Sequence, residues 1–250
     1  MLVLELPART VKPRVTGLTC INDTGTPCGE LADRLADYGS LVDIVKLGIG
    51  SAYVTPNLDR KLDLYRRYAI PVYFGGTLFE KFYHQNKLNA YLDYLRKRDI
   101  HHIEISNGTI ELPLDQRVAL TKQVKGEFIV IAEVGCKDQQ TIMPPSQWIK
   151  EMKALLEAGA AYVIAEGRDS GTAGIYRESG EIRSGLVSDI LDSVGGERVI
   201  FEAPKARDQM FLVKLAGSNV NLGNIHWQDV LVLETERQAL RYETFHIGTT

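Results

Sequence analysis

Short apolar segments alternate with longer amphipathic segments along the whole chain. Eight short segments are apolar through their centres and recur about every 25 to 35 residues, at 17–23, 41–48, 71–76, 101–106, 127–135, 162–167, 199–204 and 220–224. Continuous apolar character is typical of parallel strands that are covered on both faces. The pattern therefore predicts eight buried strands.

Between the strands, apolar residues recur at the three- and four-residue spacing of helices. Such stripes are Leu31, Leu35 and Tyr38; Leu58, Leu62 and Tyr65; Leu88, Tyr91, Leu92 and Leu95; Trp148, Met152 and Leu155; and Leu186, Ile190 and Val194. This alternation predicts one (β/α)8 TIM barrel domain over residues 1–250, a typical size for that fold. An open doubly wound sheet shows the same alternation, but eight units and the absence of a G-x-G-x-x-G motif favour a closed barrel.

Composition narrows the expected partners. A formal net charge of −3 and a pI near 6.0 disfavour nucleic acid and membrane surfaces, so a small molecule is the expected partner. Cys20, Cys28 and Cys136 form neither an even set nor a cluster, and charged residues interrupt the first twenty positions. We therefore expect a cytoplasmic protein. The five histidines show no metal-binding spacing and receive no catalytic role.

Four predicted strands carry a glutamate near their carboxyl ends. Glu104, Glu133, Glu166 and Glu202 are set among apolar neighbours on the fourth to seventh strands. A buried carboxylate is costly unless it is paired, protonated or bound to a cation. Because strand carboxyl ends form the active site of this fold, the glutamates predict a site that holds a divalent metal, Mg²⁺, or basic side chains. Structural ion pairs at the rim are the alternative.

Basic residues stand at equivalent strand ends: Lys46 is on the second strand, and Lys137, Arg168, Lys205 and Arg207 follow the fifth, sixth and seventh strands. Together with the carboxylates they favour an anionic substrate whose charge rises during reaction. A lysine in a cationic site can have its pKa lowered enough to transfer a proton near neutrality. For Lys205 and Arg207, the alternative is a solvated position at a helix start.

Small and polar residues at strand ends provide further candidates. Gly75 and Gly76 lead from the third strand into a helix, where backbone N–H groups could bind an anion or simply form a tight turn. Residues 167–174 resemble a mobile loop that covers substrate. Asn221 and Asn224 on the eighth strand are candidates to bind substrate or to form turns.

Several of these motifs together resemble the phosphosulfolactate synthase family of coenzyme M biosynthesis. The matching runs are Asp43-Ile44-Val45-Lys46-Leu47-Gly48, Gly75-Gly76-Thr77-Leu78-Phe79-Glu80, Glu104-Ile105-Ser106, Glu133-Val134-Gly135, Glu166-Gly167-Arg168, Phe201-Glu202-Ala203-Pro204 and Asn221-Leu222-Gly223-Asn224. Each run is short, but their order over almost the whole chain is specific.

The resemblance implies a Mg²⁺-dependent carbon–sulfur lyase that adds sulfite to phosphoenolpyruvate, giving (2R)-phospho-3-sulfolactate. It also implies a homo-oligomer, for which a trimer is one candidate state. It makes Lys137 the general acid and Glu104, Glu133 and Glu166 the metal-side carboxylates. The remaining candidates are Lys46 and Glu202 for catalysis and Arg168, Gly75, Gly76, Lys205, Asn221 and Asn224 for substrate binding.

Two departures from the family pattern affect these expectations. Asn107 stands where an aspartate is expected in archaeal members, which would weaken a metal contact or an ion pair. Cys136 stands where those members have a lysine, which removes a positive charge beside the anions. The pathway that receives the product, coenzyme M or sulfolactate synthesis, stays open.

Two other functions are compatible with a polar barrel mouth. An aldolase would use Lys46 or Lys137 as a Schiff-base nucleophile. A non-enzymatic, stress-related binding barrel is suggested by plant heat-stress-associated proteins that are similar to the family. The presence of Glu104, Glu133, Lys137, Glu166 and Arg168 favours an enzyme.

Overall fold

The computed structural model describes residues 4–135, 142–168 and 170–248 of the chain. All eight predicted strands are present and parallel: β1 (Thr19–Asp23), β2 (Ile44–Leu47), β3 (Val72–Phe74), β4 (His102–Ile105), β5 (Ile129–Val134), β6 (Tyr162–Ala165), β7 (Val199–Glu202) and β8 (Asn221–Ile225). They pair in the order β3-β2-β1-β8-β7-β6-β5-β4 and form a nearly closed barrel. The (β/α)8 prediction is confirmed.

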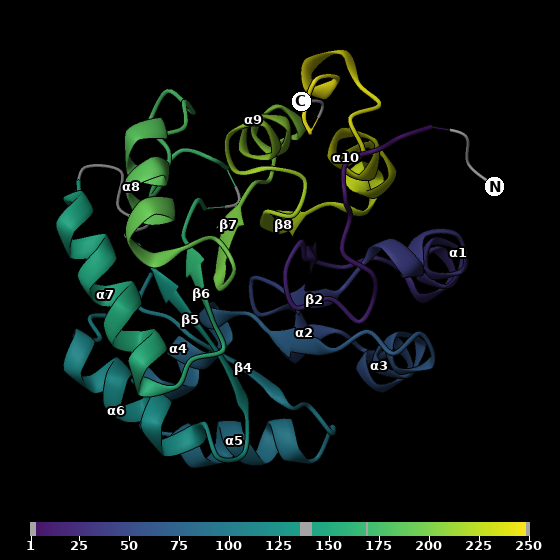
Figure 1. The fold of residues 1–250 in the computed structure, drawn as a ribbon. Helices are drawn as coiled ribbons and strands as arrows, with labels where there is room; N and C mark the ends of the chain where they lie inside the picture. The colour runs from purple at the N-terminus through teal and green to yellow at the C-terminus, as the bar shows by residue number, and fades with distance from the viewer. Residues whose placement is uncertain (1–3, 136–141, 169, 249–250) are drawn as a thin grey trace.

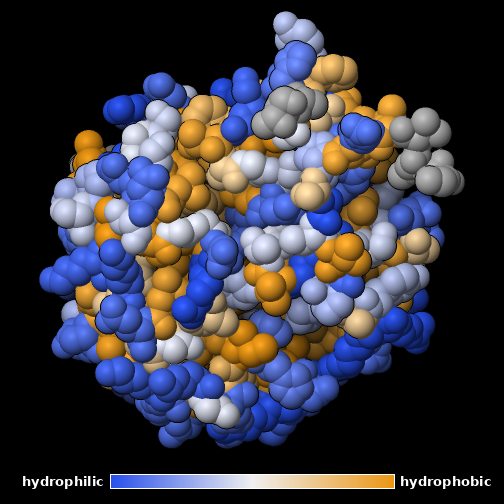
Figure 2. Space-filling model, in the orientation of Figure 1, coloured by the Kyte–Doolittle hydropathy of each residue, from blue (hydrophilic) through white to orange (hydrophobic). Residues whose placement is uncertain are grey.

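Helices surround the strands on all sides (Figure 1). They are α1 (Cys28–Tyr38), α2 (Ser51–Val54), α3 (Leu58–Arg67), α4 (Gly76–His84), α5 (Leu88–Arg96), α6 (Leu114–Val124), α7 (Pro145–Ala158), α8 (Ser184–Val194), α9 (Ala206–Ala216) and α10 (Val230–Arg237), with short 3₁₀ turns η1 (Gly39–Leu41), η2 (Trp227–Asp229) and η3 (Tyr242–Thr244). The predicted stripes bury their apolar faces against the barrel, as Leu31 and Leu35 of α1 do. Polar residues are densest along the lower edge of the face in Figure 2.

The predicted strands were longer than the observed ones at several ends. Leu41 belongs to η1 rather than to β2, and Gly75 caps α4 rather than ending β3. Only the apolar centres take part in the ladder, because the polar and glycine residues beside them enter the turns that connect strands to helices.

The barrel interior consists of two layers that follow from the alternation of side chains along a strand. One layer is apolar, with Leu18, Cys20, Ile44, Tyr73, Ile131, Ile164 and Ile200 packed together. Residues two positions further along a strand point to the same face. The next layer toward the carboxyl ends therefore contains Lys46, Glu133 and Glu202, which lie two positions after Ile44, Ile131 and Ile200 on their strands. The fold thus directs charged residues into the carboxyl-terminal mouth.

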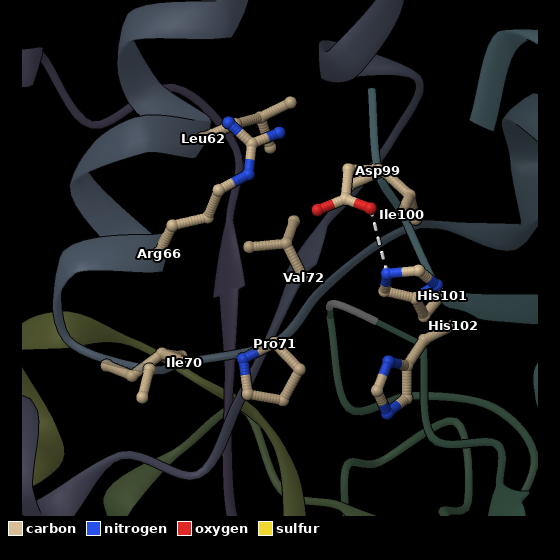
Figure 3. Close-up of a pocket in the computed structure, with 10 residues that line it drawn as sticks. Leu62, Arg66, Ile70, Pro71, Val72, Asp99, Ile100, His101 and His102 are labelled. Atoms are coloured by element: carbon tan, nitrogen blue, oxygen red, sulfur yellow. Dashed lines mark ion pairs between the residues drawn. The ribbon is translucent and has the colours of Figure 1, made fainter. Parts of the chain in front are cut away.

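A seam between β3 and β4 marks the one gap in the described ladder, since these strands stand at its two ends. At their amino-terminal ends lies a pocket of about 280 Å³, lined by Pro71, Val72 and both adjacent histidines. His101 pairs with Asp99 at 2.9 Å (Figure 3). Burial, with the charge of His101, lowers the pKa of His102 to about 4. Both histidines therefore lie at strand starts, at the end opposite the strand carboxyl ends.

Among the described residues, no helix is both long enough and apolar enough to cross a bilayer.

Candidate functional site

A polar cavity of about 180 Å³ opens at the carboxyl ends of the strands. Its lining comes from all eight strands or the turns that follow them: Asn22, Lys46, Gly48, Ile49, Gly75, Gly76, Thr77, Glu104, Glu133, Glu166, Arg168, Glu202 and Asn224. The structure therefore brings together all four glutamates, Lys46, Arg168, Asn224 and the Gly-Gly turn, as the sequence predicts.

Three of the glutamates form a compact group. Glu133, Glu166 and Glu202 belong to the neighbouring strands β5, β6 and β7, and each offers a carboxylate oxygen within 4.8 Å of the other two. All three side chains are buried. Oxygen donors at this spacing suit a hard divalent cation such as Mg²⁺. The sequence interpretation placed Glu104 in this group, and the structure has Glu202 there instead.

Glu104 belongs to β4, which pairs with β5 on one side and borders the seam on the other. Its Oε1 accepts a hydrogen bond of 2.7 Å from the backbone N–H of Gly76, at the start of α4. A carboxylate at a helix N-terminus is stabilised by the unpaired N–H groups and by the helix dipole. Glu104 therefore links β4 to the turn that follows β3.

Lys46 of β2 forms an ion pair with Glu202 of β7, across the barrel. Its Nζ lies 2.8 Å from Oε1 of Glu202, and both side chains are buried. Burial lowers the pKa of Lys46, but the charges of Glu202, Glu104, Tyr73 and Glu133 outweigh it and hold the pKa well above its ordinary value. The expectation of a lowered lysine pKa is therefore wrong for Lys46, because its surroundings are anionic rather than cationic.

The segment after β6 holds two of these glutamates in place. The Gly167 N–H donates to Oε2 of Glu202 at 3.0 Å, and the Arg168 N–H donates to Oε1 of Glu166 at 2.6 Å. The Tyr176 hydroxyl donates to the backbone carbonyl of Glu202 at 2.7 Å. A side chain at Gly174 would overlap the carbonyl of Glu166. This segment packs directly against the carboxylates.

The Gly-Gly turn leaves no space for a side chain at its second position. A Cβ atom at Gly76 would overlap the Ser106 hydroxyl and Oε1 of Glu104. Gly75 approaches the backbone of β2, where its Cβ would lie 3.2 Å from Cα of Gly48. The glycines therefore let α4 begin in contact with the mouth.

Substitution of Gly76 by alanine is expected to displace Glu104 and the start of α4, and to lower activity by at least about tenfold, as small misplacements in active sites do. Gly29→Ala in α1 is the matched control, because no atom lies within 4 Å of the added methyl group. Steady-state rates and melting temperatures of both variants check this. Equal activity of the two variants would contradict it.

Residues missed from the sequence include Asn22 and Ile49, which line the cavity, and Glu80, which bonds to the segment after β4. Asn22 lines the cavity from β1, two positions after the interior residue Cys20, so strand alternation could have identified it. Glu80 of α4 is buried and accepts hydrogen bonds from the Ser106 hydroxyl, from the Gly108 N–H at 3.0 Å and from the Thr109 N–H at 2.6 Å. A charged residue within an apolar helical stripe was the signal for Glu80.

The structure does not bring Asn221 to the mouth. Asn221 is the first residue of β8, and its amide is used at the amino-terminal end of the barrel. Its side chain accepts a hydrogen bond from the Leu18 N–H at 3.0 Å and donates to the carbonyls of Glu197 and Val199 at 2.9 and 3.1 Å. The sequence interpretation of Asn221 as a substrate-binding residue is corrected accordingly.

Three other candidates lie outside the lining of the cavity. Lys205 caps the start of α9, and Arg207 donates to the carbonyl of Gly180 at 2.7 Å. Asn107 lines a separate groove beside Arg117. The departure at position 107 therefore does not alter the cavity lining described above.

Two predicted positions cannot be placed. Lys137 and Cys136 lie outside the residues that the structure describes. The roles suggested for them from the sequence stay predictions.

Solved structures with the same architecture have very different sequences. A 3-hexulose-6-phosphate synthase covers 87% of this chain and 98% of its own length, with a TM-score of 0.54 and 11% identity. A 3-keto-L-gulonate-6-phosphate decarboxylase from Vibrio cholerae covers 88% and 96%, with a TM-score of 0.55 and 12% identity. At this identity, the likeness shows the fold alone.

Sequence relatives are much closer. A phosphosulfolactate synthase of Bacillus subtilis is 40% identical over 247 residues, 98% of each chain. One of Methanocaldococcus jannaschii is 36% identical, over 92% of this chain and 94% of its own. Residues 7–243 match the family described as (2R)-phospho-3-sulfolactate synthase (ComA). With the barrel and its glutamate-lined mouth, these matches show that the chain belongs to the (2R)-phospho-3-sulfolactate synthase family.

Proposed function

We propose that this chain catalyses the Mg²⁺-dependent addition of sulfite to phosphoenolpyruvate, which forms (2R)-phospho-3-sulfolactate. The observation that carries the proposal is the carboxylate group Glu133, Glu166 and Glu202, paired with Lys46, at the barrel mouth of a member of this family. In the reaction, the sulfur of sulfite attacks C3 of phosphoenolpyruvate. Negative charge then develops on C2 and the carboxylate, and a proton is delivered to C2.

The donor set fits a magnesium ion. Glu133, Glu166 and Glu202 supply only oxygen donors, they are buried, and their oxygens lie within 4.8 Å of one another. Repulsion among three buried carboxylates also favours binding of a cation in addition to the positive charges of Lys46 and Arg168. Bound there, Mg²⁺ would supply positive charge that stabilises the developing dianion.

Other residues of the lining suit the phosphate and carboxylate groups of the substrate. Arg168 lines the cavity after β6, and Gly75, Gly76 and Thr77 line it at the start of α4. A helix start and a guanidinium group both favour anions. The Gly76 N–H already donates to Glu104, so we assign anion binding to Arg168 and Thr77, with Asn224 as a hydrogen-bonding partner from β8.

The two lysines receive different roles. Lys46 stays protonated in its ion pair and neutralises Glu202, since carboxylates hold its pKa high. Lys137, which lies outside the described residues, keeps the role of general acid toward C2 that the family resemblance implies. This division also disfavours an aldolase reaction at Lys46, because a Schiff-base nucleophile must be an uncharged amine.

Incubation of the purified protein with phosphoenolpyruvate, sulfite and MgCl₂ tests the proposal directly. We expect phosphosulfolactate by mass spectrometry, in amounts that depend on sulfite and fall when EDTA removes the metal. Absence of this product under all conditions would overturn the proposed reaction, and full activity in EDTA would overturn the metal requirement. Borohydride treatment with a keto acid should leave the mass of the protein unchanged.

A further inference from the structure

Backbone strain is concentrated at the cavity. Within the described residues, seven non-glycine residues have positive φ angles, and three of them, Ile49, Arg168 and Asn224, line the cavity. Such conformations are unfavourable for most residues and often occur at functional sites. Three strained residues at one cavity therefore indicate that function, rather than folding, maintains these conformations.

Ile49 is the most strained of the three by residue type. It has a φ of 47° in the turn after β2, between Gly48 and Gly50. Asparagine tolerates this region, whereas a β-branched side chain is a clear outlier there. Glycine at this position would form the same turn without strain.

Packing does not explain why isoleucine occupies this position. The Ile49 side chain is 63% exposed, so its burial contributes little to folding. The hydrogen bonds of the turn use only the backbone, with the Ser51 N–H donating to the carbonyl of Gly48 at 2.9 Å and the Tyr53 N–H to that of Gly50 at 3.0 Å. Neither packing nor the hydrogen bonds of the turn therefore require an isoleucine side chain at position 49.

Its surroundings indicate a role in contacting substrate. Apart from glycines, the other described lining residues all carry charged, amide or hydroxyl side chains, so Ile49 alone presents a purely hydrocarbon surface to the cavity. The strained backbone holds this surface at the rim of the cavity, where it is still partly open to solvent. In phosphoenolpyruvate, the only apolar part is the C3 methylene, which is the carbon that reacts.

We propose that Ile49 is a substrate-contact residue that packs on the C3 end of phosphoenolpyruvate and shields it from water. The polar residues of the cavity then hold the phosphate and carboxylate, and Ile49 fixes the orientation of the carbon that sulfite attacks. This inference depends on the proposed function. It adds a determinant of specificity that selects a small unsaturated carbon end over a hydroxylated one.

The variant Ile49→Gly separates stability from activity. Relief of the positive φ angle is expected to raise the melting temperature by about 2–4 °C. Loss of the hydrocarbon contact is expected to lower kcat/KM for phosphoenolpyruvate by at least about tenfold. Ile49→Val, which keeps a β-branched hydrocarbon, should stay within about fourfold of the wild type, because it loses a single methylene group at a position that is largely open to solvent.

Ala69→Gly is the matched control, since Ala69 is also exposed, has a φ of 51° and lies at the far end of the barrel. It should raise the melting temperature and leave the kinetics unchanged. If Ile49→Gly is as active as the wild type, the inference is overturned while the proposed function stands. If the wild type forms no phosphosulfolactate, the proposed function fails and the inference with it.

Discussion

Lys46→Met is expected to abolish measurable activity and to destabilise the fold by about 3–5 kcal/mol, the usual cost of removing one partner of a buried ion pair. The methionine leaves Glu202 buried without the amine that lies 2.8 Å away in the wild type. It also removes the positive charge that Glu104 and Glu133 share. Urea denaturation and product formation measure the two effects.

The double variant Lys46→Met/Glu202→Gln distinguishes charge balance from catalysis. Replacing the carboxylate by an amide removes the uncompensated charge, so stability should recover in large part. Activity should stay at least about 100-fold below the wild type, because the cavity lacks the charges of both Lys46 and Glu202. Recovery of activity together with stability would show that the pair serves folding alone.

Glu133→Gln is expected to weaken Mg²⁺ binding by more than about 100-fold, since even residues that only orient metal ligands typically contribute 10–100-fold. The substitution keeps the size of a side chain that is only 3% exposed, and it removes one of three closely spaced carboxylates. Titration calorimetry with MgCl₂ measures the affinity without turnover. Product formation should fall in parallel.

Glu234→Gln is the control for this substitution. Glu234 of α10 is also a buried glutamate, but it pairs with Arg9 at 3.3 Å and accepts a hydrogen bond from Gln238 at 2.8 Å, at the amino-terminal end of the barrel. This variant should lose stability and keep the Mg²⁺ affinity of the wild type. Equal Mg²⁺ affinities in both variants would remove Glu133 from the proposed metal site.

Most of the fold and the general position of the site could be predicted because both depend on local periodicity. Apolar runs specify strands that are covered on both faces, and alternation places Lys46, Glu133 and Glu202 above the interior residues Ile44, Ile131 and Ile200. No long-range information is needed for either step.

The grouping of the glutamates needed the three-dimensional structure. The sequence presents Glu104 and Glu202 in equivalent settings, each near the end of an apolar strand. Both strands adjoin the other members of the group, β4 beside β5 and β7 beside β6, and only the structure shows that β4 borders the seam, where Gly76 engages Glu104. Distances between strand ends are a property of barrel closure and do not appear in local sequence.

The misplacement of Asn221 and the omission of Ile49 have different origins. Asn221 begins its strand and Asn224 lies near its end, so the polarity of the strand already separated them by about 10 Å at 3.3 Å per residue. The strain at Ile49 was hidden, because a φ angle depends on how the turn after β2 meets the mouth. Its flanking glycines were the only local indication.

The hydrogen bond between Gly76 and Glu104 has a consequence for comparing members of this family. It joins α4 to β4 at the one place where the described ladder is interrupted, so Glu104 helps to close the barrel as well as to line the cavity. A descendant that lost catalysis would still be under selection to keep this glutamate for folding. Glu104 is therefore a poor marker of retained activity, whereas Glu133, which belongs to the proposed metal site, is the more informative position.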